Sequence, residues 1–377
     1  MQERRTLTRR EFGREVALVA GASLLGGAAK AASNADVIDE ALGLLARTGP
    51  EFGGLSNHGP MAAEALVALG RPDAVLPWVN RYRKRLQPPP SERNRITAAD
   101  GWRGALGDFT RVGDLTALFD RELAAAPWRD VLARWLVRLV PGTAAVLFHG
   151  LLRTAHAARS LGRGETAPRR HELACALGYW AARFQPLPAR AMAAPRGARP
   201  SQVVAGLERV PPGRNVSGFQ VAVRELQALA SFPPVIDRVD TSGDGGAFLS
   251  DLTAIFARTY LANADARPIA FVHGVTGPAA ARLLTPFAPA EARRDLLRFT
   301  WQAAAGLYCA FAQHPPATAL AGAAPAPRRE DLVERAVATQ DEHAIKLTEA
   351  CLREHAAQPD PVYSLAAADF AARAHAS

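Results

Sequence analysis

The chain has 377 residues, of which 49% are hydrophobic, and it contains 30 glycines and 28 prolines. This length suits one large domain or two ordinary ones, and the apolar fraction excludes a disordered chain. The formal net charge of +9 comes mostly from arginines interspersed with Asp and Glu, and aromatic residues make up only 7%, so we expect solvated helix faces and no nucleic-acid partner.

The first 31 residues have the pattern of an export signal. A twin-arginine motif, TRREF at 8–12, precedes an apolar run over 16–29 and the triplet AKA at 29–31, which resembles a cleavage site. The sequence thus predicts a cleavable twin-arginine signal over 1–31, the twin-arginine export machinery as a partner, and a periplasmic or secreted protein. A retained membrane anchor is the alternative, but the apolar run is short and rich in Gly and Ala.

The rest of the chain is predicted as helices separated by coil rich in Gly and Pro. His58 lies just before Pro60, which suits the first turn of a helix because its missing N–H costs nothing there. Gly70 suits the end of the same helix. Apolar periodicity predicts the other helices. The predicted helices span 36–47, 60–69, 73–86, 128–140, 143–160, 171–184, 215–230, 246–263, 291–313 and 329–355.

The segments between these helices are predicted as loops. Residues 185–200 and 314–328 are rich in Pro and Ala, and the apolar stretch 268–278 brings His273 into a Gly-x-x-Gly-Pro bend. No strand pattern and no repeat stands out. We therefore predict an all-α fold with one large multi-helix domain over 35–358, a buried histidine-lined cavity and a C-terminal tail over 359–377.

The segment LFHGLLRTAH at 147–156 is the most informative stretch of the chain. On a helix, His149, Leu152, Arg153 and His156 lie on one face, because their spacing is i, i+3, i+4 and i+7. Two imidazoles and a guanidinium among apolar neighbours are unusual for plain core. Since seven residues span about 10.5 Å along a helix, we assign His149 to a metal and His156 to its surroundings or to the substrate cavity.

Three other histidines lie in similarly apolar surroundings. They are His58, His273 and His343, and Lys346 follows His343 at i+3, on the same helix face. Together with His149, they predict a buried metal centre. The alternative for each histidine is a hydrogen-bonded core side chain, and for Lys346 a surface lysine paired with a neighbouring glutamate. Imidazole ligands suit Zn, Cu, Fe or Ni.

Several common catalytic motifs are missing from the sequence. It has no HExxH, P-loop, strand-borne GxGxxG or GxSxG, so a metalloprotease, a nicotinamide or flavin enzyme and a serine hydrolase have no support. Cys175, Cys309 and Cys351 form no CxxC pair and no disulfide framework. We interpret each as a small buried hydrophobic residue. The polar context of His171 predicts a surface residue.

Four segments resemble the questin oxidase family. They follow the family order and lie between about residues 35 and 355: NHGPMAAEALVALG at 57–70, PGTAAVLFHGLLRTAHA at 141–157, FVHGVTGPAA at 271–280 and DEHAIKLTEA at 341–350. The resemblance implies an all-α oxygenase that inserts oxygen from O2 into polycyclic aromatic ketones or quinones, with Baeyer-Villiger-like ring opening. It further implies a mononuclear non-haem iron centre, Fe(2+), held by four histidines and a carboxylated lysine.

Carried over residue by residue, the resemblance assigns these ligands to His58, His149, His273, His343 and Lys346. Carboxylation of the lysine needs a neutral amine, which a desolvated pocket would favour. Five protein ligands leave one octahedral position, so we expect the aromatic substrate outside the coordination sphere.

Arg153, His156 and Trp102 are the candidates to orient that substrate. Arg153 would steady a phenolate, or else pair with a carboxylate in the core. The export signal departs from the intracellular fungal enzymes, so we expect a different physiological substrate. A metal-dependent hydrolase and a non-catalytic periplasmic helical binding protein remain open, as do an NADPH requirement and the oligomeric state.

Overall fold

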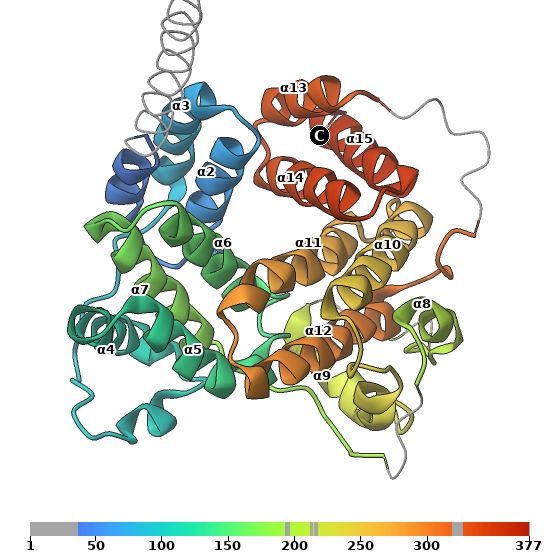
Figure 1. The fold of residues 1–377 in the computed structure, drawn as a ribbon, viewed down its shortest axis with the longest axis horizontal. Helices are drawn as coiled ribbons and strands as arrows, with labels where there is room; N and C mark the ends of the chain where they lie inside the picture. The colour runs from blue at the N-terminus through green and yellow to red at the C-terminus, as the bar shows by residue number, and fades with distance from the viewer. Residues whose placement is uncertain (1–36, 193–196, 212–213, 215–217, 319–326, 377) are drawn as a thin grey trace, which may run out of the picture.

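Helices make up most of the structure, a computed structural model that describes residues 37–192, 197–211, 214, 218–318 and 327–376 (Figure 1). The predicted all-α class is confirmed. Within the described ranges, the one sheet is a two-stranded antiparallel hairpin that precedes His58. The predicted signal over 1–31 lies outside the described residues. None of the helices described here is long and apolar enough to cross a membrane.

The helices begin where the sequence supplies capping groups or prolines. Thr166, Asp244 and Asp341 accept hydrogen bonds from backbone N–H groups of the first turns that follow them. The elements after the helical residues 37–45 are β1 (Glu51–Phe52), β2 (Leu55–Ser56), α2 (Gly59–Ala68), α3 (Pro72–Tyr82), α4 (Val112–Ala125), α5 (Trp128–Leu139), α6 (His149–Arg163), α7 (Ala167–Ala182), α8 (Pro200–Val203), α9 (Phe219–Ala228), α10 (Gly245–Asn263), α11 (Pro268–Leu284), α12 (Ala290–Phe311), α13 (Arg329–Thr339), α14 (Glu342–Ala357) and α15 (Pro361–Ala376).

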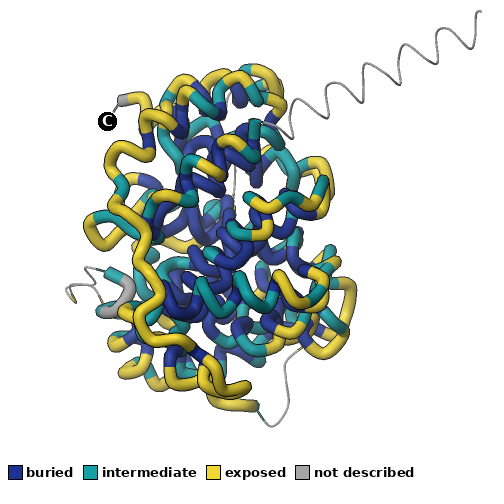
Figure 2. The backbone as a smooth tube through the Cα atoms, turned by 90° about the vertical axis from the view of Figure 1, so that its left-hand side faces the viewer, coloured by how far each residue is buried: buried dark blue, intermediate teal, exposed yellow. Residues whose placement is uncertain are grey.

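Four helices form the centre of the molecule. Helix α2 packs on α6, α6 on α11, α11 on α14, and α14 returns to α2, so that the four close a ring (Figure 1). The other helices surround this ring, with α4, α5 and α7 on the α6 side and α10, α12, α13 and α15 beside α11 and α14. Figure 2 shows that buried backbone lies inside and exposed loops lie at the periphery. The central ring therefore places residues far apart in sequence in one buried environment.

The predicted helix over 143–160 begins only at His149. Val146, Leu147 and Phe148 have φ angles of 41°, 57° and 68°, in the left-handed region. Residues other than glycine rarely adopt this backbone conformation, because it costs about 1–2 kcal/mol per residue. The helical expectation for these residues was wrong because tertiary packing, which buries Phe148, overrides the local pattern.

The bend predicted around His273 is also wrong, because α11 runs unbroken through Gly274, Gly277 and Pro278. The glycines instead allow close packing. A Cβ at Gly274 would lie 2.6 Å from the ring of Phe256, and a Cβ at Gly277 would lie 2.6 Å from the ring of Phe148.

The C-terminal part of the chain differs from expectation in two ways. The predicted helix over 329–355 is divided into α13 and α14 by Gln340, whose φ is 61°. The segment predicted as a tail forms α15, which packs against α10, α13 and α14. Its buried residues include Val362, Tyr363 and Phe370. Helix α15 is therefore part of the hydrophobic core.

Candidate metal centre

The central ring of helices brings the four predicted histidines together near helix starts. His58 is the residue before α2, His149 is the first residue of α6, and His343 is the second residue of α14. His273 comes from the second turn of α11. The Oη of Tyr82 accepts a 2.6 Å hydrogen bond from the backbone N–H of His58, which fixes the entry into α2.

The imidazoles contact one another, so the predicted histidine-lined cavity is a compact cluster. The Nε2 atom of His149 lies 2.8 Å from Nε2 of His58 and 3.2 Å from Nε2 of His273. The ring of His343 is centred 4.6 Å from that of His58 and 5.4 Å from that of His273. Two nitrogens that bind one ion at about 2.1 Å and at right angles lie about 3.0 Å apart. The two Nε2–Nε2 separations therefore fit neighbouring ligands of one ion. Among the described residues, the group of three whose ligand atoms all lie within 4.8 Å of one another is His58, Glu342 and His343.

Hydrogen bonds to the backbone determine which ring nitrogens carry protons. Nδ1 of His149 donates to the carbonyl of Val146, and Nδ1 of His273 donates to the carbonyl of Ile269 at 2.7 Å. Because a carbonyl only accepts, both neutral rings carry their proton on Nδ1 and leave Nε2 with a bare lone pair. Two lone pairs that face each other in a buried site repel, and a cation bound by both nitrogens would remove this repulsion. Metal-binding histidines commonly donate the other ring N–H to a carbonyl in this way.

Burial keeps the four imidazoles neutral. It lowers the pKa of His58, His149 and His343 well below the usual 6.5, and nearby positive groups lower it further. The pKa of His273 falls to about 3, first through burial and then through the charge of Lys346. Neutral imidazole is the form that binds metals, so the donor chemistry fits a metal ion.

Lys346 joins the cluster from α14. Its Nζ lies 3.1 Å from Nδ1 of His58, the ring nitrogen opposite the one that faces His149. Burial lowers the pKa of Lys346 to about 8, partly offset by Glu342 and Asp341. A substantial fraction of the amine is therefore neutral near physiological pH, as carboxylation requires.

Glu342 is a candidate that the sequence interpretation missed. Its carboxylate and the imidazoles of His58 and His343 place ligand atoms within 4.8 Å of one another. The same carboxylate pairs with Arg85 at 2.9 Å. The sequence contained a signal for Glu342, because this residue directly precedes a predicted ligand at the start of a helix.

The residues predicted to orient a substrate have other partners. Arg153 donates from Nε and Nη2 to the carboxylate of Glu172 at 2.6 and 2.8 Å, which is the alternative left open by the sequence. The Nδ1 of His156 lies 2.7 Å from the carboxylate of Glu64. Trp102 packs edge-on against Trp135 in the core. These contacts account for the three side chains by packing and ion pairing.

A network of buried ion pairs crosses the same four helices farther along their axes. Its members lie six to eleven residues after the histidine of their own helix, about 9–16 Å along the axis. The network therefore joins the four histidine-bearing helices at a second position along their axes. It runs from Glu64 of α2 through Arg159 of α6, Glu349, Arg353 and Glu354 of α14 to Arg282 of α11.

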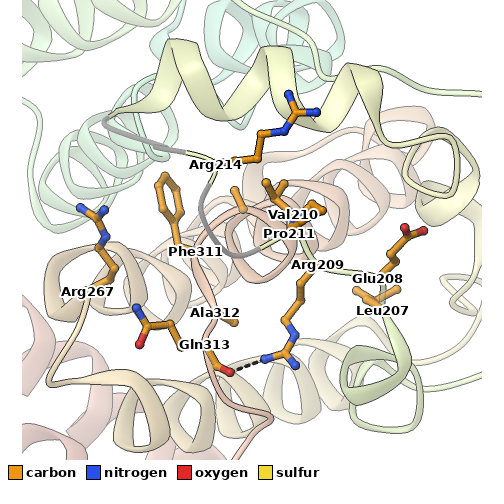
Figure 3. A pocket seen from close by; sticks show the side chains of 11 residues that line it. Leu207, Glu208, Arg209, Val210, Pro211, Arg214, Arg267, Phe311, Ala312 and Gln313 are labelled. Atoms are coloured by element: carbon orange, nitrogen blue, oxygen red, sulfur yellow. Dashed lines mark hydrogen bonds between the residues drawn. The ribbon is translucent and has the colours of Figure 1, made fainter.

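A large cavity occurs away from the predicted site residues. It has a volume of about 710 Å³ and lies between residues 207–211, Arg214 and the C-terminal end of α12 (Figure 3). Arg209 donates to the carbonyl of Gln313 across it at 2.6 Å. Its lining includes none of the predicted ligands.

No protein-family model matches the sequence, and a search of curated proteins gives no significant match.

Proposed function

We propose that the protein is an oxygenase with a mononuclear non-haem iron centre, held by His58, His149, His273, His343 and Lys346. Its substrate would be a polycyclic aromatic ketone or quinone that receives oxygen from O2 with ring opening. The observation that carries the metal is the pair of bare Nε2 atoms of His149 and His273, which face each other at 3.2 Å. The choice of iron and of oxygen chemistry rests on the resemblance to the questin oxidase family.

Activation of dioxygen is the chemistry that iron supplies in such a site. The chain contributes a dry environment, because His58, His149 and His273 are each at most 6% exposed. The His343 side chain is 14% exposed, the most open of the four. We therefore infer that small molecules approach past His343, with Phe370 of α15 6.4 Å from its ring centre.

Helix ends favour an anion at this position. His58, His149 and His343 lie at the N-terminal ends of α2, α6 and α14, where the helix dipoles carry partial positive charge. Such ends stabilise a phenolate oxygen of the substrate, or the carboxylate formed when the neutral amine of Lys346 takes up CO2. The helix ends would therefore orient the substrate in place of Arg153 and His156, because these two side chains pair with Glu172 and Glu64.

Export is the second part of the proposal. The motif TRREF and the apolar run within residues 1–31 support a twin-arginine signal and a periplasmic or secreted protein. That route carries folded proteins, which suits an enzyme that binds its metal before export.

Elemental analysis of the purified protein tests the metal centre. We expect near-stoichiometric iron in the wild type and in His314→Ala, a matched control at an exposed histidine. His149→Ala should lose the metal, and Lys346→Ala should weaken its binding. An oxygen electrode with a panel of quinones and polycyclic phenols then tests the oxygenase chemistry.

The outcomes separate the three classes of function. Iron with substrate-dependent oxygen uptake supports the oxygenase. Zinc with activity under anaerobic conditions would point to a metal-dependent hydrolase. A protein that binds no metal after anaerobic reconstitution with iron(II) would contradict the centre and favour the helical binding protein.

A further inference from the structure

A second group of reactive side chains lies between α4 and α7. His171 and Cys175 are one turn apart on α7, and Sγ of Cys175 lies 3.5 Å from Nε2 of His171. The opposite ring nitrogen, Nδ1, lies 2.9 Å from Oδ1 of Asp120 on α4. A thiol, an imidazole and a carboxylate are thus connected in series. This is the order in which a carboxylate orients a histidine and the histidine activates a nucleophile.

All three side chains line one cavity of about 320 Å³. Much of the remaining wall is apolar or small, which suits an organic molecule rather than a bare ion. Arg153 supplies a cation to the same wall. Glu172 engages its Nε and Nη2, so Nη1 lies outside this ion pair. The apolar and small lining residues are Ala46, Pro50, Pro89, Pro90, Val112, Gly113 and Ala117.

Cys175 differs from the other two cysteines in its accessibility. Cys309 and Cys351 are buried, at 2% and 1% exposed, whereas Cys175 is half-buried at the cavity wall. The prediction that all three are buried hydrophobic residues is therefore wrong for Cys175. A reagent that enters the cavity meets this thiol while the other two remain covered.

The charges around the imidazole favour its protonated form. The other ionisable groups that line the same cavity are Asp120 on α4, Arg153, which pairs with Glu172, and Glu92, which pairs with Arg121. The hydrogen bond with Asp120, followed by the contact with Cys175, raises the pKa of His171 to about 11. A protonated imidazole next to a thiol stabilises the thiolate, which is the nucleophilic form.

We propose that Cys175, His171 and Asp120 form a nucleophilic site that hydrolyses carboxylic esters bound in this cavity. The thiol proton moves to Nε2 of His171, which gives the protonated imidazole beside the thiolate, and Sγ bonds to the ester carbonyl carbon. The C–O bond breaks, and the alcohol leaves with the proton from His171. Water then hydrolyses the acyl-cysteine, which yields the acid and restores the thiol. The reaction consumes one ester and one water.

A metal site is the competing interpretation of the same residues. Asp120 occupies the ring nitrogen that faces away from Cys175, so only the thiol and one imidazole nitrogen point to a common position. Zinc sites normally use three or four protein ligands. The geometry therefore favours nucleophilic chemistry, and this activity does not depend on the histidine cluster.

Alkylation of the intact protein tests the activation of the thiol. We expect iodoacetamide at pH 7 to modify Cys175 but neither Cys309 nor Cys351, as read by peptide mass spectrometry. An ordinary thiol is only about 3% thiolate at pH 7, so His171→Gln should slow modification at pH 7 at least tenfold and change it little at pH 9. His355→Gln, at another half-buried histidine, is the matched control. Equal rates in wild type and His171→Gln at pH 7 would overturn the proposal.

Reaction with p-nitrophenyl butyrate tests acyl transfer. We expect a burst of nitrophenolate near one equivalent, with a butyryl group on Cys175, and neither in Cys175→Ala. The assay is run with a metal chelator present, so that hydrolysis at the histidine cluster does not contribute. Absence of the acyl group from Cys175, or unchanged hydrolysis in Cys175→Ala, would overturn the ester-hydrolase assignment.

Discussion

Each imidazole of the cluster has a local constraint, and for His149 this constraint includes backbone strain. The carbonyl that accepts its Nδ1 proton belongs to Val146, a β-branched residue with a φ angle of 41°. Such a conformation persists only when the surroundings hold it, and it is frequent at functional sites. The strained turn therefore has a specific consequence: it directs a carbonyl to Nδ1 and leaves Nε2 without a proton, facing His58 and His273.

Glu342 provides a test of the charge beside the cluster. Glu342→Gln keeps the shape of the side chain but removes a carboxylate close to His58 and His343. We expect metal affinity to fall about 10–100-fold, as is typical for groups that support metal ligands, measured by competition with a chelator.

The control for this substitution is Glu334→Gln, at an exposed glutamate that pairs with Arg71. It should leave metal affinity unchanged. If Glu342→Gln also has no effect, then Glu342 serves only its ion pair with Arg85.

At the scale of elements, glycines allow close helix contacts beside the predicted ligands. A Cβ at Gly150 would lie 2.5 Å from the ring of Trp180, whereas the nearest atom to a Cβ at Gly162, on the same helix, is 3.8 Å away. Gly150→Ala should lower the free energy of unfolding by about 1–3 kcal/mol, because it overpacks the α6–α7 contact. Gly162→Ala should raise the free energy of unfolding by up to about 1 kcal/mol through helix propensity.

Denaturant unfolding of the two variants measures this difference. Because Gly150 follows His149 directly, Gly150→Ala should also weaken metal binding. Equal stabilities of the two variants would contradict the packing explanation.

Much of the helical pattern could be predicted from the sequence, and the exceptions have physical causes. The residues before His149 were predicted as helix, because the periodicity of side chains does not reveal a left-handed backbone. Helix α15 is rich in alanine, so its buried face is weakly marked. Helix α4 was missed although Val112, Leu115, Phe119 and Leu123 repeat on one face and are buried. The apolar periodicity of α4 was therefore sufficient to predict this helix.

The two candidate sites differ in how far the sequence could predict them. The predicted metal ligands lie in apolar segments, and the structure brings these five side chains into one cluster. The spacing of His171 and Cys175 at i and i+4 was also visible. Their partner Asp120 could not be assigned, because it comes from the unpredicted α4 and meets α7 only in the folded protein.

For the whole molecule, the buried ion network gives stability a dependence on pH. Burial alone would raise the pKa of Glu64, but the charge of Arg159 and the hydrogen bond with His156 lower it to about 2. Since this value lies below the usual 4.5, the stabilisation is complete above pH 4.5 and is lost as pH falls toward 2.

Glu64→Gln tests this dependence, because it leaves Arg159 without one of its carboxylate partners. We expect a loss on the order of 3–5 kcal/mol in unfolding free energy at pH 7, as for other broken buried ion pairs. The difference from wild type should shrink between pH 4.5 and 2. Asp331→Asn, at an exposed pair with Arg328, should unfold like the wild type. A difference between wild type and Glu64→Gln that stays constant with pH would exclude this role of Glu64.

The four histidines are distributed over nearly the whole described chain, from His58 to His343. During synthesis, the ribosome releases the N-terminal half, with two imidazoles, long before α11 and α14 emerge. In the proposed metal centre, an ion that arrives early would therefore meet an incomplete ligand set and exchange freely. Only the completely folded chain would retain the ion, so metal retention would report that folding is complete.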